Sequence, residues 1–376
     1  MKVMIIVNVD WFFISHRLPI ALAARNRGYS VSIAVGDTGR IDEIRAMGFE
    51  VHNIPVDRSG SDVIGLIRLF WSYFRLLRTT TPDVVHLVTI KPVLLGGIAA
   101  RIAGVPGVLA AISGLGHVFV AEGFMGKIRR ALVSIFYRIA FGKDNIRVIF
   151  QNPVDERRLR RLARLPPNKV VSIPGSGVDL EKYLVSPLPS PGPPVFVMAS
   201  RLLVKKGVRE FVAAAGLVKA NGVGAEFWLV GEPDRGNLAS IKSEELDSWK
   251  AEGLVQILGF RNDVASIMAA GHVVVLPSYY GEGLPKVLIE AAACGRAVIT
   301  TDMPGCRDAI EAGVTGLLVS PRNAGALASA MAELAQDPAR CARMGQAGRE
   351  RAERIFDVRH VVDSHLHIYQ ELASRA

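Results

Sequence analysis

The stretch from 281 to 290 carries two carboxylates, those of Glu282 and Glu290, in a setting typical of a ligand-binding loop. It follows a β-branched apolar run at 273–276 and leads through Pro285 into an alanine-rich segment. This order predicts a strand, a loop and a helix, so the loop lies at the carboxyl end of the strand. Open α/β sheets bind ligands at that end, and a helix start there directs N–H groups toward an anion. A single glutamate in such a turn can equally cap the helix.

Two cations lie in a second loop of the same kind. Arg201 and Lys206 follow the apolar run at 195–199 and precede a predicted helix at 208–219. Arginine can bind a phosphate through two hydrogen bonds and lysine acts as a point charge, so the pair suits a diphosphate. A solvated loop with two surface cations is the alternative. The cations and the carboxylates should nevertheless converge, because parallel strands present their carboxyl ends at one edge of a sheet.

The elements that position these residues alternate between strand and helix through most of the chain. Apolar strands are predicted at 2–9, 29–35, 50–54, 83–88, 107–112 and 147–150, and again at 195–199, 226–230, 255–258, 273–276 and 297–301. Helical segments between them predict an α/β fold with two doubly wound, Rossmann-like parallel sheets. We expect a first domain at 1–183, a proline-rich linker at 184–194, a second domain at 195–357, and a final helix at 358–376 that packs back on the first domain. A cleft between two such domains is the expected small-molecule site.

Composition narrows the class of protein further. The 376 residues are 50% hydrophobic, which suits a globular enzyme of two domains. Three scattered cysteines predict neither a disulfide framework nor a metal cluster, and the first residues resemble a strand rather than a signal peptide. The most apolar segment, at 94–112, is interrupted by Arg101 and Pro106, so no membrane-spanning helix is expected. These features predict a cytoplasmic protein.

The net charge of +10 is unevenly distributed. Residues 1–190 hold 25 Lys and Arg against 14 Asp and Glu, which leaves 45 − 25 = 20 against 35 − 14 = 21 beyond them. This asymmetry indicates a polyanionic partner for the first half, either an anionic membrane surface or nucleic acid. Solubilising charge without a partner is the simpler alternative.

The motifs together resemble the GT-B retaining glycosyltransferases of group 4. The resemblance rests on Ser200-Arg201 with Lys206-Gly207, on Glu282-Gly283-Leu284-Pro285 running to Glu290-Ala291, and on the segment 173–179 that enters the second domain. It covers nearly the whole chain. It implies the GT-B fold, in which two Rossmann-like domains face one another across a cleft.

The resemblance also implies roles for individual residues. Arg201 and Lys206 would hold the diphosphate of a nucleotide-sugar donor with UDP as the nucleotide, Glu282 would contact the hexose, and Glu290 would hold the ribose hydroxyls. The donor-binding set comprises Arg201, Lys206, Glu282, Gly283, Leu284, Pro285, Lys286, Val287 and Glu290, with Phe260 and Arg261 placed near the base by position alone. The sequence has no Asp-x-Asp motif, so we expect metal-independent transfer and no cofactor.

The first domain is expected to select the acceptor. Trp11, His16 and Arg17 follow the first strand and could face a lipid or sugar, or form an ordinary hydrophobic loop with a capped helix. His117 lies in a glycine-rich turn after the strand at 107–112 and could act in the cleft as a catalytic group, or simply form the turn.

Two segments, at 66–78 and 127–138, are aromatic, apolar and basic. Such helices can lie in a membrane interface with their cations on anionic headgroups, or pack on the core while the basic side chains extend to solvent. Within the family the sequence resembles bacterial transferases that add N-acetylhexosamine to undecaprenyl-diphosphate-linked sugars in glycan or O-antigen assembly. We therefore expect a lipid-linked saccharide acceptor at the cytoplasmic membrane face.

Other functions remain open at this point. A nucleotide-sugar epimerase, or a transferase with a soluble acceptor, would use the same donor site. A nucleic-acid-binding protein is the non-enzymatic alternative, because of the arginine-rich run at 157–161. That run resembles one solvated helix face and carries no zinc spacing or RNA-recognition motif, so we expect no nucleic-acid partner.

Overall fold

The computed structural model describes residues 1–55, 63–115, 123–190, 192–234, 237 and 239–375, with the main chain alone over 123–130. It divides into two compact units, Met1–Ser176 with Val358–Ala376, and Gly177–Asp357. The proline-rich segment expected to link the domains therefore belongs to the second unit. The division falls earlier because Val178, Leu180 and Tyr183 are already buried in the core of that unit.

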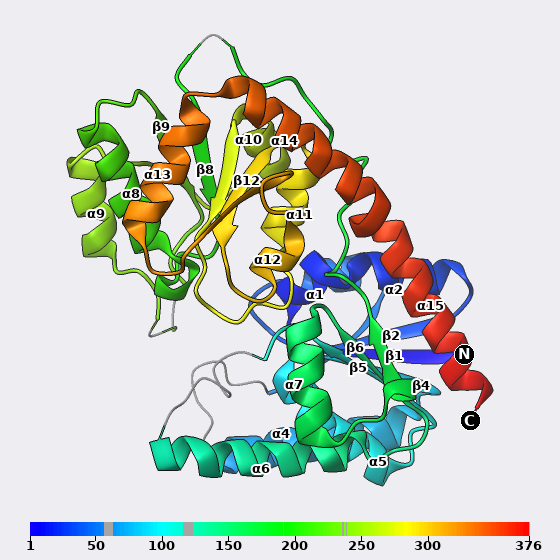
Figure 1. Cartoon of the computed structure of the whole chain (residues 1–376). Helices are drawn as coiled ribbons and strands as arrows, with labels where there is room; N and C mark the ends of the chain where they lie inside the picture. The colour runs from blue at the N-terminus through cyan, green and yellow to red at the C-terminus, as the bar shows by residue number, and fades with distance from the viewer. Residues whose placement is uncertain (56–62, 116–122, 191, 235–236, 238, 376) are drawn as a thin grey trace. The chain divides into compact units, whose positions relative to one another are not determined.

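The first unit is built on a parallel sheet whose seven strands in the described part of the chain have the order β3-β2-β1-β4-β5-β6-β7 (Figure 1). The strands are β1 (Lys2–Val9), β2 (Ser30–Gly36), β3 (Glu50–Asn53), β4 (Val84–Val88), β5 (Gly107–Ile112), β6 (Ile146–Phe150) and β7 (Val170–Ser172). Alternate side chains of β1 enter different cores: Val3 and Ile5 face one cluster, and Met4 and Ile6 face the other. Both faces are covered, which explains why the strand is continuously apolar.

Helices cover both faces of this sheet. They are α1 (Asp10–His16), α2 (Leu18–Asn26), α3 (Ile41–Ala46), α4 (Val63–Thr80), the π-helix η1 (Pro92–Gly96) continued by α5 (Gly97–Ala103), α6 (Gly123–Phe141), α7 (Pro153–Ala163), the 3-10 turn η3 (Pro167–Lys169) and α15 (Val358–Ser374). The final helix, α15, packs on α2 and β5, as the red ribbon in Figure 1 shows. The aromatic segment after β1, for which an ordinary hydrophobic loop was one of two interpretations, is the helix α1, because Arg17 N bonds Phe13 O and closes its last turn.

The second unit is a parallel sheet with the order β10-β9-β8-β11-β12-β13. Its strands are β8 (Val195–Ala199), β9 (Glu226–Val230), β10 (Gln256–Gly259), β11 (Val273–Leu276), β12 (Ala297–Thr301) and β13 (Gly316–Val319). Its helices are η4 (Val204–Lys206), α8 (Val208–Ala220), α9 (Ser243–Ala251), α10 (Val264–Ala270), α11 (Lys286–Ala293), α12 (Cys306–Ala309), α13 (Ala324–Ala335), α14 (Pro338–Arg351) and η5 (Ala352–Phe356). The predicted fold class, with two Rossmann-like parallel sheets, is confirmed.

Each sheet has a point where the order of the strands reverses, between β1 and β4 in the first and between β8 and β11 in the second. Doubly wound sheets bind ligands outside the carboxyl ends of the strands at such a point. No helix in the described ranges is long and apolar enough to cross a membrane.

Candidate functional site

Lys206 and Glu282 meet at the point of strand reversal in the second unit. Lys206 ends the turn η4 that follows β8, and Glu282 lies in the loop that follows β11, the neighbouring strand. The ammonium Nζ is 2.6 Å from the carboxylate Oε1, and their side chains are 17% and 13% exposed. The predicted convergence of cation and carboxylate at one sheet edge is therefore present in the structure.

A second group fixes this carboxylate. The hydroxyl of Ser278 donates to Glu282 Oε1 at 3.0 Å, and Thr301 donates to the carbonyl of Ser278. Sequence reasoning missed Ser278, although it follows β11 after Pro277, where a small polar residue near a strand end is a usable signal. Together these bonds hold the acidic loop against the end of the sheet.

Close packing of the loops accounts for two glycines. Gly207 has φ +83°, and a Cβ at this position would lie 2.1 Å from Pro277 O. Gly305 has φ +82°, and its Cβ would lie 2.6 Å from Glu282 O. Both positions need a residue without a side chain, because the loop of Lys206 and the turn before α12 press against the acidic loop.

The negative charge of Glu282 affects its neighbours. Burial, and then the charge of Glu282, raise the pKa of the Cys306 thiol to about 12. Burial and the same carboxylate raise the pKa of Tyr280, which the nearby Arg201 opposes. Cys306 and Tyr280 are therefore neutral at physiological pH, and the charge at this site is carried by Lys206, Glu282 and Arg201.

Arg201 follows β8 and is held by a carboxylate of the next loop. Its Nη1 lies 3.0 Å from Asp234 Oδ2; the arginine side chain is 46% exposed and that of the aspartate 9%. The guanidinium of Arg201 thus lies near the surface and is held in place by the carboxylate of Asp234. Asp234 was not singled out from the sequence, because it lies outside any recognisable spacing with Arg201.

Glu290 lies one further turn into α11 and is almost completely buried. The hydroxyl of Tyr183 donates to its Oε1 at 2.7 Å, and Lys286 Nζ is 3.4 Å from the same oxygen. Burial, and then the charge of Glu290, raise the pKa of Tyr183, so the phenol remains a hydrogen-bond donor. The carboxylate of Glu290, the second of the motif, is therefore held in position by Tyr183, which lies 107 residues earlier in the chain.

The remaining residues of the motif form the start of α11. Pro285 is the residue before the first helical position rather than part of the helix, with φ −63° and ψ 121°. Gly283, Leu284 and Pro285 are buried, and Lys286 and Val287 are partly buried in the first turn. This start lies at the carboxyl end of β11, as predicted.

Phe260 and Arg261 lie apart from this group, after the outer strand β10, which β9 separates from β8. Phe260 is 61% exposed, and Arg261 pairs with Asp263 at 2.6 Å. Their assignment to a base pocket stays a prediction.

The expected acceptor-side residues lie on and after α1. The rings of Phe12 and His16 stack with centroids 4.0 Å apart, and Trp11 packs edge-on to Phe12. Arg17, in contrast, is only 2% exposed, and its Nη1 donates to the carbonyl of His16 at 2.9 Å. Burial lowers the pKa of Arg17 to about 10. Its guanidinium is therefore buried inside the first unit, and Trp11 and His16 are the more accessible of the three.

Two further expectations concern histidine and metal. His117 lies outside the described residues, so its predicted role has no structural account here. In the ranges that the structure describes, no group of three or more His, Cys, Asp or Glu side chains could hold a metal ion.

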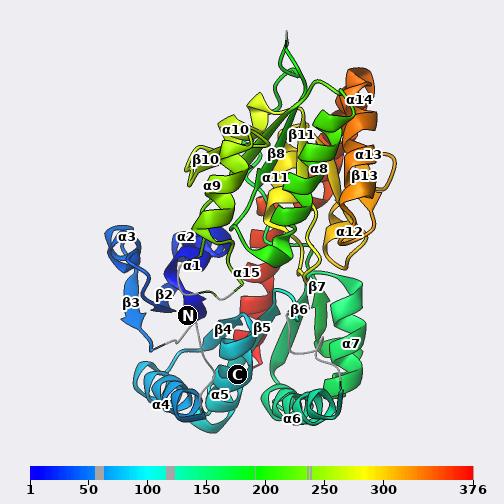
Figure 2. The same ribbon diagram turned by 90° about the vertical axis from the view of Figure 1, so that its left-hand side faces the viewer.

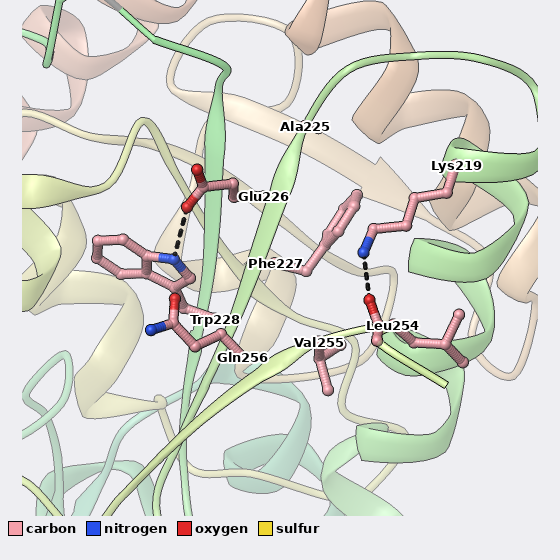
Figure 3. Close-up of a pocket in the computed structure, with 9 residues that line it drawn as sticks. Lys219, Ala225, Glu226, Phe227, Trp228, Leu254, Val255 and Gln256 are labelled. Atoms are coloured by element: carbon pink, nitrogen blue, oxygen red, sulfur yellow. Dashed lines mark hydrogen bonds between the residues drawn. The ribbon is translucent and has the colours of Figure 1, made fainter. Parts of the chain in front are cut away.

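A separate cavity of about 370 Å³ opens where β9 and β10 begin, at the opposite ends of the strands from Lys206 and Glu282 (Figure 3). In it Trp228 Nε1 donates to Glu226 Oε2 at 3.2 Å, and Lys219 Nζ donates to Gly253 O at 2.5 Å. Lys219 and Trp228 thus each donate to another residue of the lining, and the cavity contains none of the predicted site residues.

Comparison with known proteins identifies the class. The family model "Glycosyl transferase 4-like" matches residues 2–151, and the model "Glycosyl transferases group 1" matches residues 193–337. Together they match most of the chain, one model for each sheet. The protein is therefore a glycosyltransferase.

Individual proteins similar to this chain indicate its family more closely. An N,N'-diacetylbacillosaminyl-diphospho-undecaprenol alpha-1,3-N-acetylgalactosaminyltransferase of Campylobacter jejuni is 29% identical over 85% of this chain and 86% of its own. A UDP-Gal:alpha-D-GlcNAc-diphosphoundecaprenol alpha-1,3-galactosyltransferase of Escherichia coli is 26% identical over 83% and 81%. The structure of Anabaena HepE, solved with UDP, superimposes with a TM-score of 0.75 at 20% identity over 99% and 100% of the two chains. The chain belongs to the GT-B glycosyltransferases of family 4, and the predicted resemblance is confirmed.

Proposed function

We propose that this glycosyltransferase moves a hexose or N-acetylhexosamine from a UDP-sugar to a polyprenyl-diphosphate-linked saccharide, with retention of anomeric configuration and without a metal ion. The observation that carries the proposal is the pairing of Lys206 and Glu282 at the reversal point of the second sheet. A cation and a carboxylate in contact can bind, respectively, the diphosphate and the hydroxyl groups of one sugar nucleotide.

The charges at this site suit the departure of a diphosphate. Breaking the bond between the sugar C1 and the β-phosphate oxygen builds negative charge on the leaving group. Lys206 and Arg201 supply two fixed positive charges after β8, which supports transfer that needs no metal to neutralise that charge. The choice of UDP as the nucleotide of the donor is supported by the structure of Anabaena HepE, which has a similar fold and was solved with UDP.

Glu282 acts in this proposal as a sugar-binding residue rather than as a nucleophile. Its Oε1 is engaged by Lys206 and Ser278, which favours a carboxylate that orients hydroxyl groups. The acceptor oxygen then forms its bond to C1 on the face that the diphosphate leaves. The proton of the acceptor hydroxyl passes to the departing phosphate oxygen. Because the acceptor oxygen, and not Glu282, bonds to C1, no covalent glycosyl-enzyme forms.

A lipid-linked saccharide as the acceptor is supported by the two bacterial relatives, because the names of both enzymes include a sugar linked to diphospho-undecaprenol. Such an acceptor is anchored in a membrane, so the enzyme has to reach the lipid surface. The basic first half of the chain is consistent with that requirement.

Two helices of the first unit support peripheral binding at the cytoplasmic face. Helices α4 and α6 both flank α5 on one face of the first sheet (Figure 2). Each turns an apolar stripe to solvent: Ile64, Ile67 and Trp71 on α4, and Leu132, Ile135, Phe136 and Ile139 on α6, all at least 40% exposed. Exposed Arg68, Arg75 and Arg78 extend along α4. Apolar and basic side chains together suit an anionic lipid surface.

A transfer assay tests the proposal. Purified protein is incubated with each of several UDP-hexoses and UDP-N-acetylhexosamines, and with a short polyprenyl-diphosphate saccharide or the same saccharide without lipid. We expect one donor to yield a product one sugar larger on the lipid-linked acceptor, and no product with the Glu282→Ala variant. Equal transfer to the lipid-free saccharide would overturn the acceptor class. A new nucleotide sugar formed without acceptor would indicate an epimerase instead.

A further inference from the structure

Tyr183 and Glu290 form a buried hydrogen bond in the second unit, separate from the ion pair of Lys206 and Glu282. Tyr183 is 6% exposed and Glu290 8% exposed, and the phenol donates to Glu290 Oε1 at 2.7 Å. The carbonyl of Tyr183 accepts a bond from Arg349 Nη1 at 2.9 Å, and the same nitrogen donates to Ala293 O in the last turn of α11. The tyrosine is thus tied at both ends to the helix that carries Glu290.

Both side-chain partners of Glu290 bind the same oxygen. Lys286 Nζ is 3.4 Å from Oε1, the oxygen that Tyr183 already contacts, and Oε2 takes part in neither interaction. A carboxylate accepts about four hydrogen bonds, two at each oxygen. The geometry therefore fixes the rotation of the carboxylate and leaves the lone pairs of Oε2 directed away from Tyr183.

We propose that Tyr183 is a positioning residue that orients Glu290 so that Oε2 accepts hydrogen bonds from the ribose hydroxyls of the donor, which gives the enzyme its preference for ribonucleotide over 2′-deoxyribonucleotide sugars. This inference rests on the proposed use of a nucleotide sugar and on the ribose-binding role that the family resemblance implies for Glu290. A carboxylate held in one orientation binds a vicinal diol better than one that rotates, because its geometry is set before the ligand arrives. A site built to accept from a hydroxyl also rejects the analogue without it, since the buried acceptor is left unpaired.

The alternative is that Tyr183 only anchors the start of the second unit to its core. In that case the loss of the hydroxyl would lower stability and affect ribose and deoxyribose donors equally. The ratio of kcat/KM for the two donors separates the two roles.

The test compares the UDP-sugar that the wild type uses with its 2′-deoxy-UDP counterpart, in wild type and Tyr183→Phe. We expect Tyr183→Phe to lower the preference for the ribose donor by about three- to tenfold, the usual net effect of one hydrogen bond. Tyr73→Phe is the matched control, since Tyr73 is a fully buried tyrosine in the first unit, remote in the chain from the donor loops. It should leave the ratio unchanged. In a Glu290→Gln background, Tyr183→Phe should change the ratio little further, because the two residues act as a unit.

An unchanged ratio in a folded Tyr183→Phe protein would overturn the proposal, whatever happens to its melting temperature. If that variant does not fold, Tyr183→Met also lacks the hydroxyl and must show the same loss. Calorimetric binding of UDP against 2′-deoxy-UDP gives the same comparison without turnover. If the wild type neither binds UDP nor uses a UDP-sugar, the proposed function itself has failed, which is a different result from a wild type that discriminates and a variant that discriminates equally.

Discussion

Lys206 and Glu282 form an ion pair in the second unit, with Nζ 2.6 Å from Oε1. The two residues come from loops after neighbouring strands, 76 positions apart, and the bond to the carboxylate fixes the position of the ammonium group that we propose binds the diphosphate. A diphosphate entering the site gains a cation that is already oriented, while the carboxylate becomes available to sugar hydroxyls. The pair should act as a unit in binding and in transfer.

Replacing Lys206 by alanine should lower kcat for transfer by about 100-fold or more, because a fixed charge that stabilises the leaving group is lost. Steady-state rates with the preferred donor provide the measurement. Lys219→Ala is a suitable control, since this lysine lies in the cavity at the opposite ends of the strands. The double variant with Glu282→Ala should lose less than the sum of the two single losses. Rates near wild type for Lys206→Ala would refute the role assigned to the pair.

Arg201 should contribute mainly to donor binding. Its guanidinium is 46% exposed and held by Asp234, so Arg201→Ala should raise KM for the donor by roughly tenfold, as expected for the loss of a charge-assisted phosphate contact. Donor titrations at fixed acceptor measure this effect. Arg209, which forms a similarly exposed pair with Glu245, gives the matched control. A larger KM effect in Arg209→Ala than in Arg201→Ala would contradict this assignment.

The exposed apolar stripes of α4 and α6 should bind lipid. Trp71→Glu and Ile135→Glu should each weaken sedimentation with vesicles containing anionic lipid, because each adds a charge to a surface that would enter the headgroup region. Leu217→Glu, an exposed apolar position in the second unit, is the control and should not change sedimentation. Binding that survives both changes on the two helices would exclude this surface as the membrane contact.

Acid should destabilise the first unit through two buried histidines. Burial, followed by nearby positive charge, lowers the pKa of His365 to about 3, and it lowers the pKa of His86 well below its usual range. Both are neutral when folded and take up protons near pH 6.5 when unfolded, so the stability they provide is complete above about pH 6.5 and is lost as pH falls toward 3. The slope reaches at most about 1.4 kcal/mol per pH unit for each histidine.

Melting temperatures between pH 7.5 and 4 check this prediction. The groups that face the histidines are Arg17 and Tyr369, and Tyr369 Oη lies 2.7 Å from His86 Nδ1. The double variant His86→Asn, His365→Asn should be less stable at pH 7.5 and should show a flatter decline on acidification. A decline parallel to that of the wild type would assign the acid sensitivity to other groups.

The sequence was sufficient to predict the fold class and the convergence of the cations and carboxylates at one edge of the second sheet. Arg201, Lys206 and Glu282 could be placed because parallel strands put their carboxyl ends at one edge, and strand periodicity is readable from apolar runs. Asp234 and Tyr183 could not, since each meets its partner through loop geometry that no local pattern encodes.

The acceptor side was less predictable. Arg17 was expected to face an acceptor, but a cation next to an aromatic segment gives no sign that it will be 2% exposed. The sequence left a loop open as one interpretation of the segment that forms α1, because seven residues are too few for helical periodicity to stand out. The predicted end of the first domain, at residue 183, lies after the division that the structure shows at Ser176, because the proline-rich segment is a stronger local signal than the buried Val178 and Tyr183 that precede it.

The anomeric configuration of the product tests the central claim most directly. The reaction is run with an α-linked UDP-sugar and a polyprenyl-diphosphate saccharide in excess chelator, and the new glycosidic bond is assigned by NMR coupling constants. We predict an α linkage, formed at a rate that the chelator does not change. A β linkage, or a rate that falls with chelator and returns with added divalent cation, would contradict retaining, metal-independent transfer by Lys206, Arg201 and Glu282.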